Sequence, residues 1–185
     1  MKSLNVNADL FNQFILEKVI PGIKAKIPHW RKHEKFFIQM DNARPHSQST
    51  KVQEIHKALG SGGWNLEIRP QPAQSPDLNV LDLCLFNSMQ SMQAKQPFAN
   101  IRDAVNRIDE VFENYCPEKL DNSFITLQAV MQLVFKHEGK NDYKLPHLGK
   151  DKKKRAGDPM ITFPICDDAY LTGMSAMATL QLKLQ

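Results

Sequence analysis

The sequence has few cysteines and no long apolar run. Its three cysteines, Cys84, Cys116 and Cys166, lie far apart and form no CxxC pair. This odd, scattered set argues against a disulfide framework and against a zinc site, and it suits a reducing compartment. No stretch approaches the ~20 apolar residues of a membrane span, and the first residues lack the apolar segment of a signal peptide. We therefore expect an intracellular protein that does not enter a membrane.

A strong excess of one charge is also missing. The 185 residues contain 24 Lys and Arg against 20 Asp and Glu, which gives a formal net charge of +4. This excess is compatible with nucleic acid as a partner but does not by itself indicate one. The hydrophobic fraction of 42% and the charged fraction of 24% are instead typical of a globular domain with a real core.

Apolar periodicity in the first half of the chain predicts helices that alternate with strands. A helix is expected from about residue 8 to the Pro21-Gly22 pair, and another over Ser47–Leu59. The apolar run Phe36–Met40 is typical of a buried strand, and the alternation at residues 64–68 predicts a second strand. Strands that alternate with helices favour an α/β fold with parallel strands.

The second half is predicted to be helical. A rigid proline-rich loop at residues 70–76 precedes an apolar stripe that runs from Leu78 to Met92 at helical spacing. Two further helices are expected at about residues 101–114, with Asn100 as the cap, and 118–137.

From residue 149 onward the apolar pattern is poor. We predict one domain over residues 1–148 and a basic, extended or disordered tail over residues 149–185. The tail contains the basic cluster Lys150–Arg155. This cluster and the basic stretch Lys24–Lys35 are both able to meet phosphate, although such runs are more often solvated surface.

Asp41 stands where the first predicted strand ends. Ligand-binding and catalytic groups in α/β sheets collect at the carboxyl ends of strands. Asp and Asn are also frequent turn formers, so Asp41 and Asn42 are equally consistent with a plain turn.

Asp82 lies about one turn into the helix that follows the proline-rich loop. The helix dipole favours an ionised carboxylate at this position. The neighbours Leu81 and Leu83 are apolar, and a carboxylate among apolar groups needs a partner, a metal or an open cleft. The alternative is an ordinary acidic residue in a first helical turn.

Two segments around these aspartates resemble the motifs of a known family. Phe36–His46 (FFIQMDNARPH) is similar to the second-aspartate motif of mariner-like DDE transposases, and Gln74–Asp82 (QSPDLNVLD) to their third-carboxylate motif. The two motifs have the family's order and a family-like separation. The similarity covers roughly residues 4–150, and it includes Lys18–Pro21, Leu127–Met131 and Asn141–His147.

The resemblance implies the C-terminal part of a DDE endonuclease domain with a ribonuclease-H-like fold, N-terminally truncated and followed by C-terminal helices. In such enzymes three carboxylates hold two Mg²⁺ (or Mn²⁺) ions, which activate the nucleophile and stabilise the leaving oxygen of a DNA phosphodiester. By position, Asp41 and Asp82 are catalytic residues and metal ligands, while Asn42 and His46 are supporting residues. The resemblance further implies that DNA is the partner, that the chain forms a homodimer and that the protein is located in the nucleus.

The family's first aspartate and its helix-turn-helix region have no counterpart in these 185 residues. Two aspartates with waters are expected to hold one ion weakly, so we expect little or no strand transfer by the chain. The strand that ends at Asp41 is expected to expose an apolar edge, which predicts marginal stability.

Three alternatives stay open at this point. The chain is a non-catalytic nucleic-acid-binding or protein-interaction remnant of a transposable element, or a piece of a complete transposase. The last alternative is an unrelated α/β domain in which both motifs occur by chance.

Overall fold

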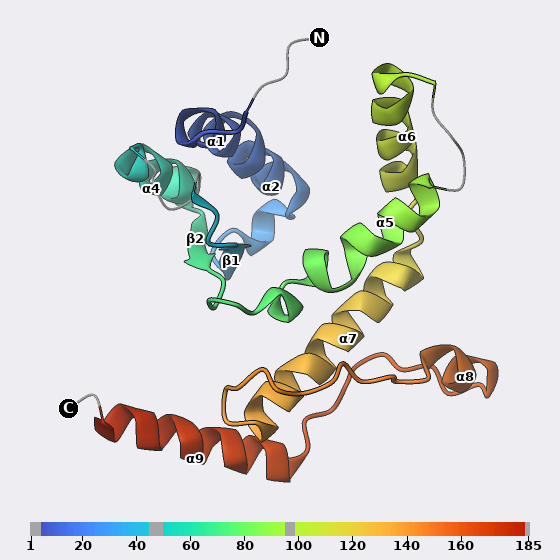
Figure 1. The fold of residues 1–185 in the computed structure, drawn as a ribbon. Helices are drawn as coiled ribbons and strands as arrows, with labels where there is room; N and C mark the ends of the chain where they lie inside the picture. The colour runs from blue at the N-terminus through green and yellow to red at the C-terminus, as the bar shows by residue number, and fades with distance from the viewer. Residues whose placement is uncertain (1–4, 45–49, 95–98, 184–185) are drawn as a thin grey trace. The chain divides into compact units, whose positions relative to one another are not determined.

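The computed structural model describes residues 5–44, 50–94 and 99–183 (Figure 1). The chain forms two compact units, one ending at Ala73 and one beginning at Gln74. Across the described residues the chain is 64% helical, with a two-stranded parallel sheet. The predicted α/β class with parallel strands is therefore confirmed. Two strands are too few to identify a ribonuclease-H-like fold, which stays a prediction.

The first unit opens with a helical stretch that passes through a proline. Its segments are α1 (Ala8–Phe14), the π-helix η1 (Ile15–Val19) and α2 (Ile20–Lys26). The side chain of Asn7 caps α1 by accepting the Leu10 N–H at 2.9 Å. The predicted stop at Pro21-Gly22 is wrong. Pro21 occupies the first turn of α2, directly after the wide turn of η1, and proline is tolerated where its missing N–H is not needed.

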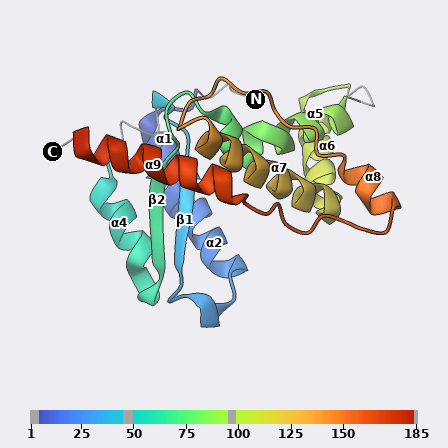
Figure 2. The same ribbon diagram turned by 90° about the horizontal axis from the view of Figure 1, so that it is seen from below.

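The sheet consists of β1 (Lys35–Met40) and β2 (Asn65–Pro70), which confirms both predicted strands. They pair in parallel, from Lys35 opposite Asn65 to Met40 opposite Pro70, and Figure 2 shows them side by side. The connection between them contains α4 (Val52–Gly60) and the short helix η3 (Ser61–Gly63). The helix predicted over residues 47–59 is thus confirmed from Val52, while residues 47–49 lie outside the described part of the chain. Before β1, His29–Arg31 forms the short helix η2.

The helices cover one face of this small sheet and form a core with it. Six buried residues make the cluster: Ile15, Ile20, Ile55, Leu59, Trp64 and Leu66. The prediction that β1 is a buried strand is wrong, because its exposure alternates and Phe37 is 49% exposed. The outer face of Phe37 instead carries the guanidinium of Arg69, 3.7 Å from the ring centroid, as a cation–π contact.

All the regular elements described in the second unit are helices, and long loops separate the last of them. Its elements are η4 (Pro76–Leu78), the π-helix η5 (Leu81–Leu85), α5 (Phe86–Gln93), α6 (Ile101–Glu113), α7 (Pro117–Lys136), α8 (Lys150–Arg155) and α9 (Asp167–Lys183). The predicted helices at 101–114 and 118–137 are confirmed as α6 and α7. Asn100 caps α6 as predicted, accepting the Asp103 N–H at 3.0 Å.

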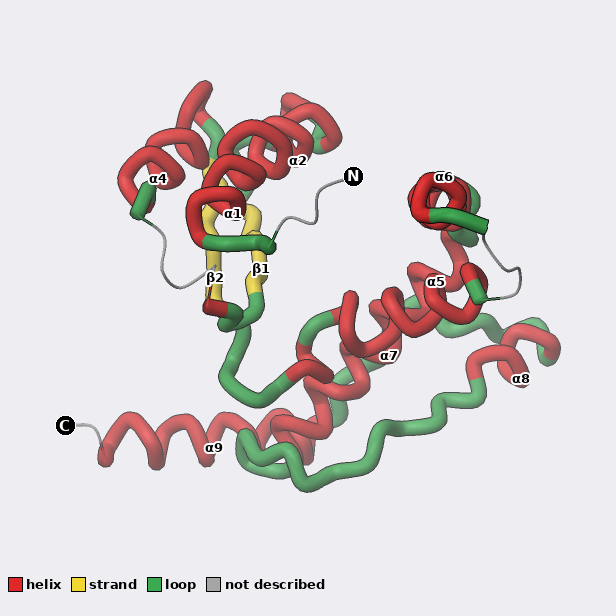
Figure 3. Tube along the Cα trace, turned by 45° about the horizontal axis from the view of Figure 1, so that its top comes forward, coloured by secondary structure: helices red, strands yellow, loops and turns green. Residues whose placement is uncertain are grey.

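The expectation of an extended or disordered tail over residues 149–185 is wrong for α8 and α9. Long loops connect α7, α8 and α9 (Figure 3). Helix α9 packs against α7 through the buried residues Ala169 and Gly173. A Cβ at Gly173 would lie 1.8 Å from Cδ1 of Phe135, so only glycine permits this approach. Two small residues one turn apart create no apolar stripe, which is why the periodicity of the sequence did not indicate the contact.

None of the helices in the described part of the chain has the length and apolar character of a membrane span.

Candidate functional site

Asp41 lies at the carboxyl end of β1, directly after Met40, and is exposed. Its Oδ1 accepts the N–H of Ala43 at 3.2 Å. This contact is the side-chain turn that short acidic residues form with the backbone two positions ahead. Asp41 therefore sits at the strand end where the sequence placed it, and it also makes the local turn that was the plainer alternative.

Asn42 joins the carboxyl ends of the two strands. Its Nδ2 donates to the carbonyl of Gln71 at 2.8 Å, and the N–H of Gln71 donates to the carbonyl of Met40 at 2.6 Å. These bonds extend the pairing of the strands by one residue beyond the ladder. Asn42 thus links the ends of the two strands directly beside Asp41. The other predicted supporting residue, His46, lies outside the described residues.

Asp82 lies in the second unit, in the first turn of the π-helix η5, and is exposed. Asn79 prepares this turn. Its Oδ1 accepts the Leu81 N–H at 3.1 Å, and its Nδ2 donates to Oδ2 of Asp82 at 2.9 Å. Single π-turns are rare and frequently occur at functional sites. The carboxylate is thus held in place at a helix start.

A similar pair of residues at the start of α6 gives a standard for comparison. Asn100 Nδ2 donates to Oδ2 of Asp103 at 3.0 Å, with the same three-residue spacing as Asn79 and Asp82. An Asn–Asp pair of this kind is therefore also an ordinary way to begin a helix. What separates Asp82 from Asp103 is the π-turn and the motif around it.

The loop ahead of Asp82 is fastened by a segment that sequence reasoning did not assign a role. The Tyr143 hydroxyl donates to Oδ2 of Asp77, and Asn141 Nδ2 donates to the carbonyl of Gln74 at 3.3 Å. Burial, with help from Asp77, raises the pKa of Tyr143 well above its ordinary value. The phenol is therefore neutral and acts as a donor at any ordinary pH.

His137 in turn supports this clasp. Its Nδ1 lies 2.9 Å from Oδ1 of Asp142, and its ring meets the Tyr143 ring edge-on with centroids 5.4 Å apart. The hydrogen bond with His137 lowers the pKa of Asp142. The similarity of residues 141–147 to a family segment was the only signal in the sequence that pointed here.

Several basic residues that were available for phosphate are occupied inside their own units. Lys24 Nζ donates to the carbonyls of Ala58 at 2.6 Å and Ser61 at 2.9 Å, which ties α2 to the end of α4. Partial burial lowers the pKa of Lys24. The basic stretch before β1 is thus in part a structural cross-link.

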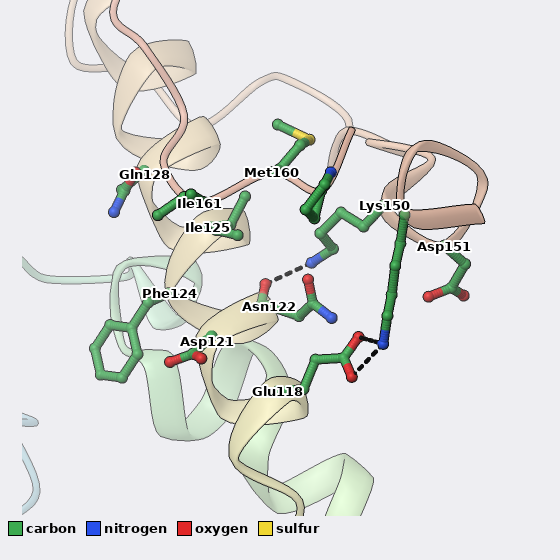
Figure 4. A pocket seen from close by; sticks show the side chains of 12 residues that line it. Glu118, Asp121, Asn122, Phe124, Ile125, Gln128, Lys150, Asp151, Met160 and Ile161 are labelled. Carbon is green, nitrogen blue, oxygen red and sulfur yellow. Dashed lines mark hydrogen bonds and ion pairs between the residues drawn. The ribbon is translucent and has the colours of Figure 1, made fainter. Parts of the chain in front are cut away.

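Two lysines of the basic cluster 150–155 are likewise engaged. They line a cavity of about 420 Å³ between α7, α8 and residues 159–161 (Figure 4). Lys150 Nζ donates to Oγ1 of Thr126 at 2.6 Å, and burial lowers its pKa. Lys154 Nζ contacts both carboxylate oxygens of Glu118 at 2.6 Å. The cluster therefore fastens α8 to α7, while Lys152, Lys153 and Arg155 are exposed and make no contact with α7 that is described here.

The carboxylates Asp41 and Asp82 belong to different units, and each is seen in its own surroundings. Within the described residues, no three His, Cys, Asp or Glu side chains gather closely enough to hold a metal ion. Each aspartate nevertheless offers exposed carboxylate oxygens, the hard ligands that Mg²⁺ prefers. Their chemistry fits a divalent cation.

Comparison of this chain with protein-family models, with curated proteins and with solved structures found no match. The likeness to mariner-like transposases thus depends on the motif residues themselves. Among these residues, Asp41 and Asn42 directly follow strand β1, and Asp82 lies in the first turn of η5.

Proposed function

We propose that this chain is a DNA-processing domain of the mariner-like DDE transposase type, with Asp41 and Asp82 as two of its three metal-binding carboxylates. The observation that carries the proposal is the ordered pair of motifs. Support comes from where their aspartates lie: one follows a parallel strand, and the other begins a helix through a π-turn. Enzymes built on parallel sheets bind ligands at the carboxyl ends of their strands. Charged groups of negative sign are favoured at helix N-termini.

The chemistry of this class depends on oxygen ligands for Mg²⁺ or Mn²⁺. When bound, such ions activate a nucleophile and stabilise the leaving oxygen of a phosphodiester. Asp41 and Asp82 would hold the ions, and Asn42 would keep Asp41 at the strand end. Tyr143 would keep the loop before Asp82 in place through Asp77. The ribonuclease-H-like fold and a nuclear location belong to the same proposal.

These 185 residues supply two carboxylates where the family uses three. Mg²⁺ demands near-ideal octahedral coordination, so two aspartates completed by water bind it weakly. We therefore expect weak metal binding and little or no cleavage of DNA from the chain by itself.

The test is to measure Mn²⁺ binding to the full chain by electron paramagnetic resonance and by calorimetry. Asp41→Asn and Asp82→Asn are each expected to weaken binding at least about tenfold, which corresponds to ~1.4 kcal/mol. Asp103→Asn is the matched control. Asp103 also lies at a helix start and accepts a hydrogen bond from an asparagine three residues earlier, but it lies outside the motif. The proposal fails if all three variants bind Mn²⁺ like the parent chain.

A second candidate is a non-catalytic binding module derived from the same kind of element. The solvent-facing basic residues of α8, Lys152, Lys153 and Arg155, favour it, since such residues can bind phosphates without a metal. DNA binding that persists in EDTA and in Asp41→Asn, but falls when these three residues are changed to Ala, would select this function over the nuclease.

A further inference from the structure

A second cavity of the helical unit lies between α7, the loop at residues 146–149 and α8. It shares Lys150 and Asp151 with the cavity of Figure 4 and has a volume of about 430 Å³. Small-molecule sites in proteins occupy ~300–1,000 Å³, so this volume is sufficient for a compact ligand. Six of its lining residues have polar or charged side chains: Thr126, His147, Lys150, Asp151, Lys152 and Arg155.

Positive charge predominates in this lining. Lys150, Lys152 and Arg155 supply three basic groups, and Asp151 supplies the one carboxylate among the lining residues described. Three against one leaves an excess of positive charge, with His147 counted as neutral. A concave surface with an excess of one charge concentrates the electrostatic potential and attracts ions of the opposite sign. The lining therefore suits an anion.

The basic groups of α8 in this lining are available to a ligand. In the part of the chain that the structure describes, Lys152 is exposed and forms no ion pair, while Arg155 uses its Nε to donate to the Asp151 carbonyl at 3.3 Å. In the neighbouring cavity, by contrast, Lys154 is neutralised by the Glu118 carboxylate at 2.6 Å. The two cavities thus differ in the charge that they offer.

Lys150 is fixed in the wall by the protein itself. Its ammonium donates to the Asn122 carbonyl, as Figure 4 shows, and to Oγ1 of Thr126 at 2.6 Å. Thr126 in turn donates its own proton to the Asn122 carbonyl at 2.9 Å, so its hydroxyl oxygen accepts from Lys150. An ammonium group has three N–H bonds, and two of them are used here. The third is left for a ligand.

We propose that this cavity binds a small sugar phosphate. The planar guanidinium of Arg155 matches the spacing of phosphate oxygens, and Lys150 and Lys152 add two point charges. Pro146 and Leu148 give the organic part of the ligand an apolar wall. His147 has the one aromatic ring among the lining residues described, so a nucleobase would have little surface on which to stack. The lining therefore favours a sugar over a base.

Lys153 separates this ligand from a nucleic-acid backbone. It lies on the same short helix as Lys152 and is exposed, but it is outside the described lining. A DNA backbone attracted by charge alone gains affinity from both lysines. A ligand inside the cavity depends on Lys152 and is insensitive to Lys153.

The test is isothermal titration calorimetry of the full chain with ribose 5-phosphate. EDTA is present, so a metal at Asp41 or Asp82 takes no part and the result is independent of the proposed nuclease function. We expect a dissociation constant between ~10 µM and ~1 mM, as for a few charge-assisted hydrogen bonds. Inorganic phosphate should bind more weakly, and ribose should give no heat of binding.

Lys152→Gln and Arg155→Gln should each weaken the binding of ribose 5-phosphate by about tenfold or more, since each removes a charged donor. Lys153→Gln is the matched control and should bind like the parent chain. All three variants change exposed side chains, so circular dichroism should stay that of the parent.

Three results would overturn the proposal. The first is no heat of binding at ~10 mM ribose 5-phosphate. The second is an equal loss of affinity in Lys152→Gln and Lys153→Gln, which would indicate a diffuse attraction to the charge of α8. The third is inorganic phosphate that binds as tightly as ribose 5-phosphate, which would exclude recognition of the sugar.

Discussion

The two units of this chain hold their elements together by different means. In the first, apolar residues from helices and strands converge on one cluster around β2. In the second, the buried positions lie mainly on α7, at Ile125, Ala129 and Val130, and meet Ala169 of α9. Many apolar residues of α6 and α9 stay exposed. The comparison teaches that one unit closes its apolar residues into a core, while the other buries few of them and leaves many apolar side chains on its helices exposed.

The largest predicted effect tests the core of the first unit. Leu59 is 3% exposed in α4, so Leu59→Ala should destabilise this unit by about 2–5 kcal/mol through lost burial and a cavity. Urea denaturation with hydrogen exchange on β1 and β2 measures it. Val52→Ala, on the same helix but at a position 51% exposed, is the control and should change stability by less than about 0.5 kcal/mol. Equal effects at both positions would contradict the assignment of the core.

The next prediction compares one glycine in each unit. Gly173→Ala places a Cβ on the Phe135 ring and should weaken the α7–α9 contact by about 1–3 kcal/mol through overpacking. Gly22→Ala, with nothing within 4 Å of the new Cβ in α2, should stabilise the first unit by up to about 1 kcal/mol. Thermal unfolding of both variants measures whether each change raises or lowers the stability of the chain. Partial rescue of Gly173→Ala by Phe135→Ala would confirm that the ring causes the loss.

A smaller effect concerns the loop before Asp82. Tyr143→Phe removes the hydroxyl that donates to Asp77, and one hydrogen bond is worth about 0.5–1.5 kcal/mol. Amide exchange of residues 74–78 should accelerate accordingly, while Tyr170→Phe, at a position 47% exposed on α9, should leave it unchanged. Unaltered exchange in Tyr143→Phe would remove the positioning role that we assign to this residue.

The smallest effect is a pH dependence of stability that arises from Glu67 on strand β2. Hydrogen bonds from Lys35, and then from Arg69, lower the pKa of Glu67 below its ordinary value of 4.5. A lowered folded-state pKa means that the stabilisation is present at neutral pH and disappears as the pH falls through the folded value. Glu67→Gln should therefore melt below the parent chain at pH 7 and level with it in strong acid. A difference that persists unchanged in acid would exclude the carboxylate as its source.

Much of the fold could be predicted from local pattern. Both strands, the parallel class, α6 with its Asn100 cap, and α7 follow from periodicity, since each has a clear apolar spacing and a distinct start or stop. The burial of β1 could not be predicted in the same way. An apolar run indicates that a strand can be buried on both faces. Whether both faces of β1 are buried depends on which other elements pack against the sheet.

For the candidate site, the sequence by itself determined which residues to examine: two aspartates, one after a strand and one at a helix start. It also determined the strand before Asp41 and the helical segment that carries Asp82, because those depend on neighbours within a few residues. Only the tertiary structure decided the π-turn under Asp82, the Asn42 bridge between strand ends and the Tyr143 clasp on Asp77. It also decided the seating of α9 on Phe135. The Asn42, Tyr143 and α9 contacts join residues far apart in the chain, so no local pattern contains them. The π-turn is local, but apolar spacing does not distinguish it from an α-helical turn.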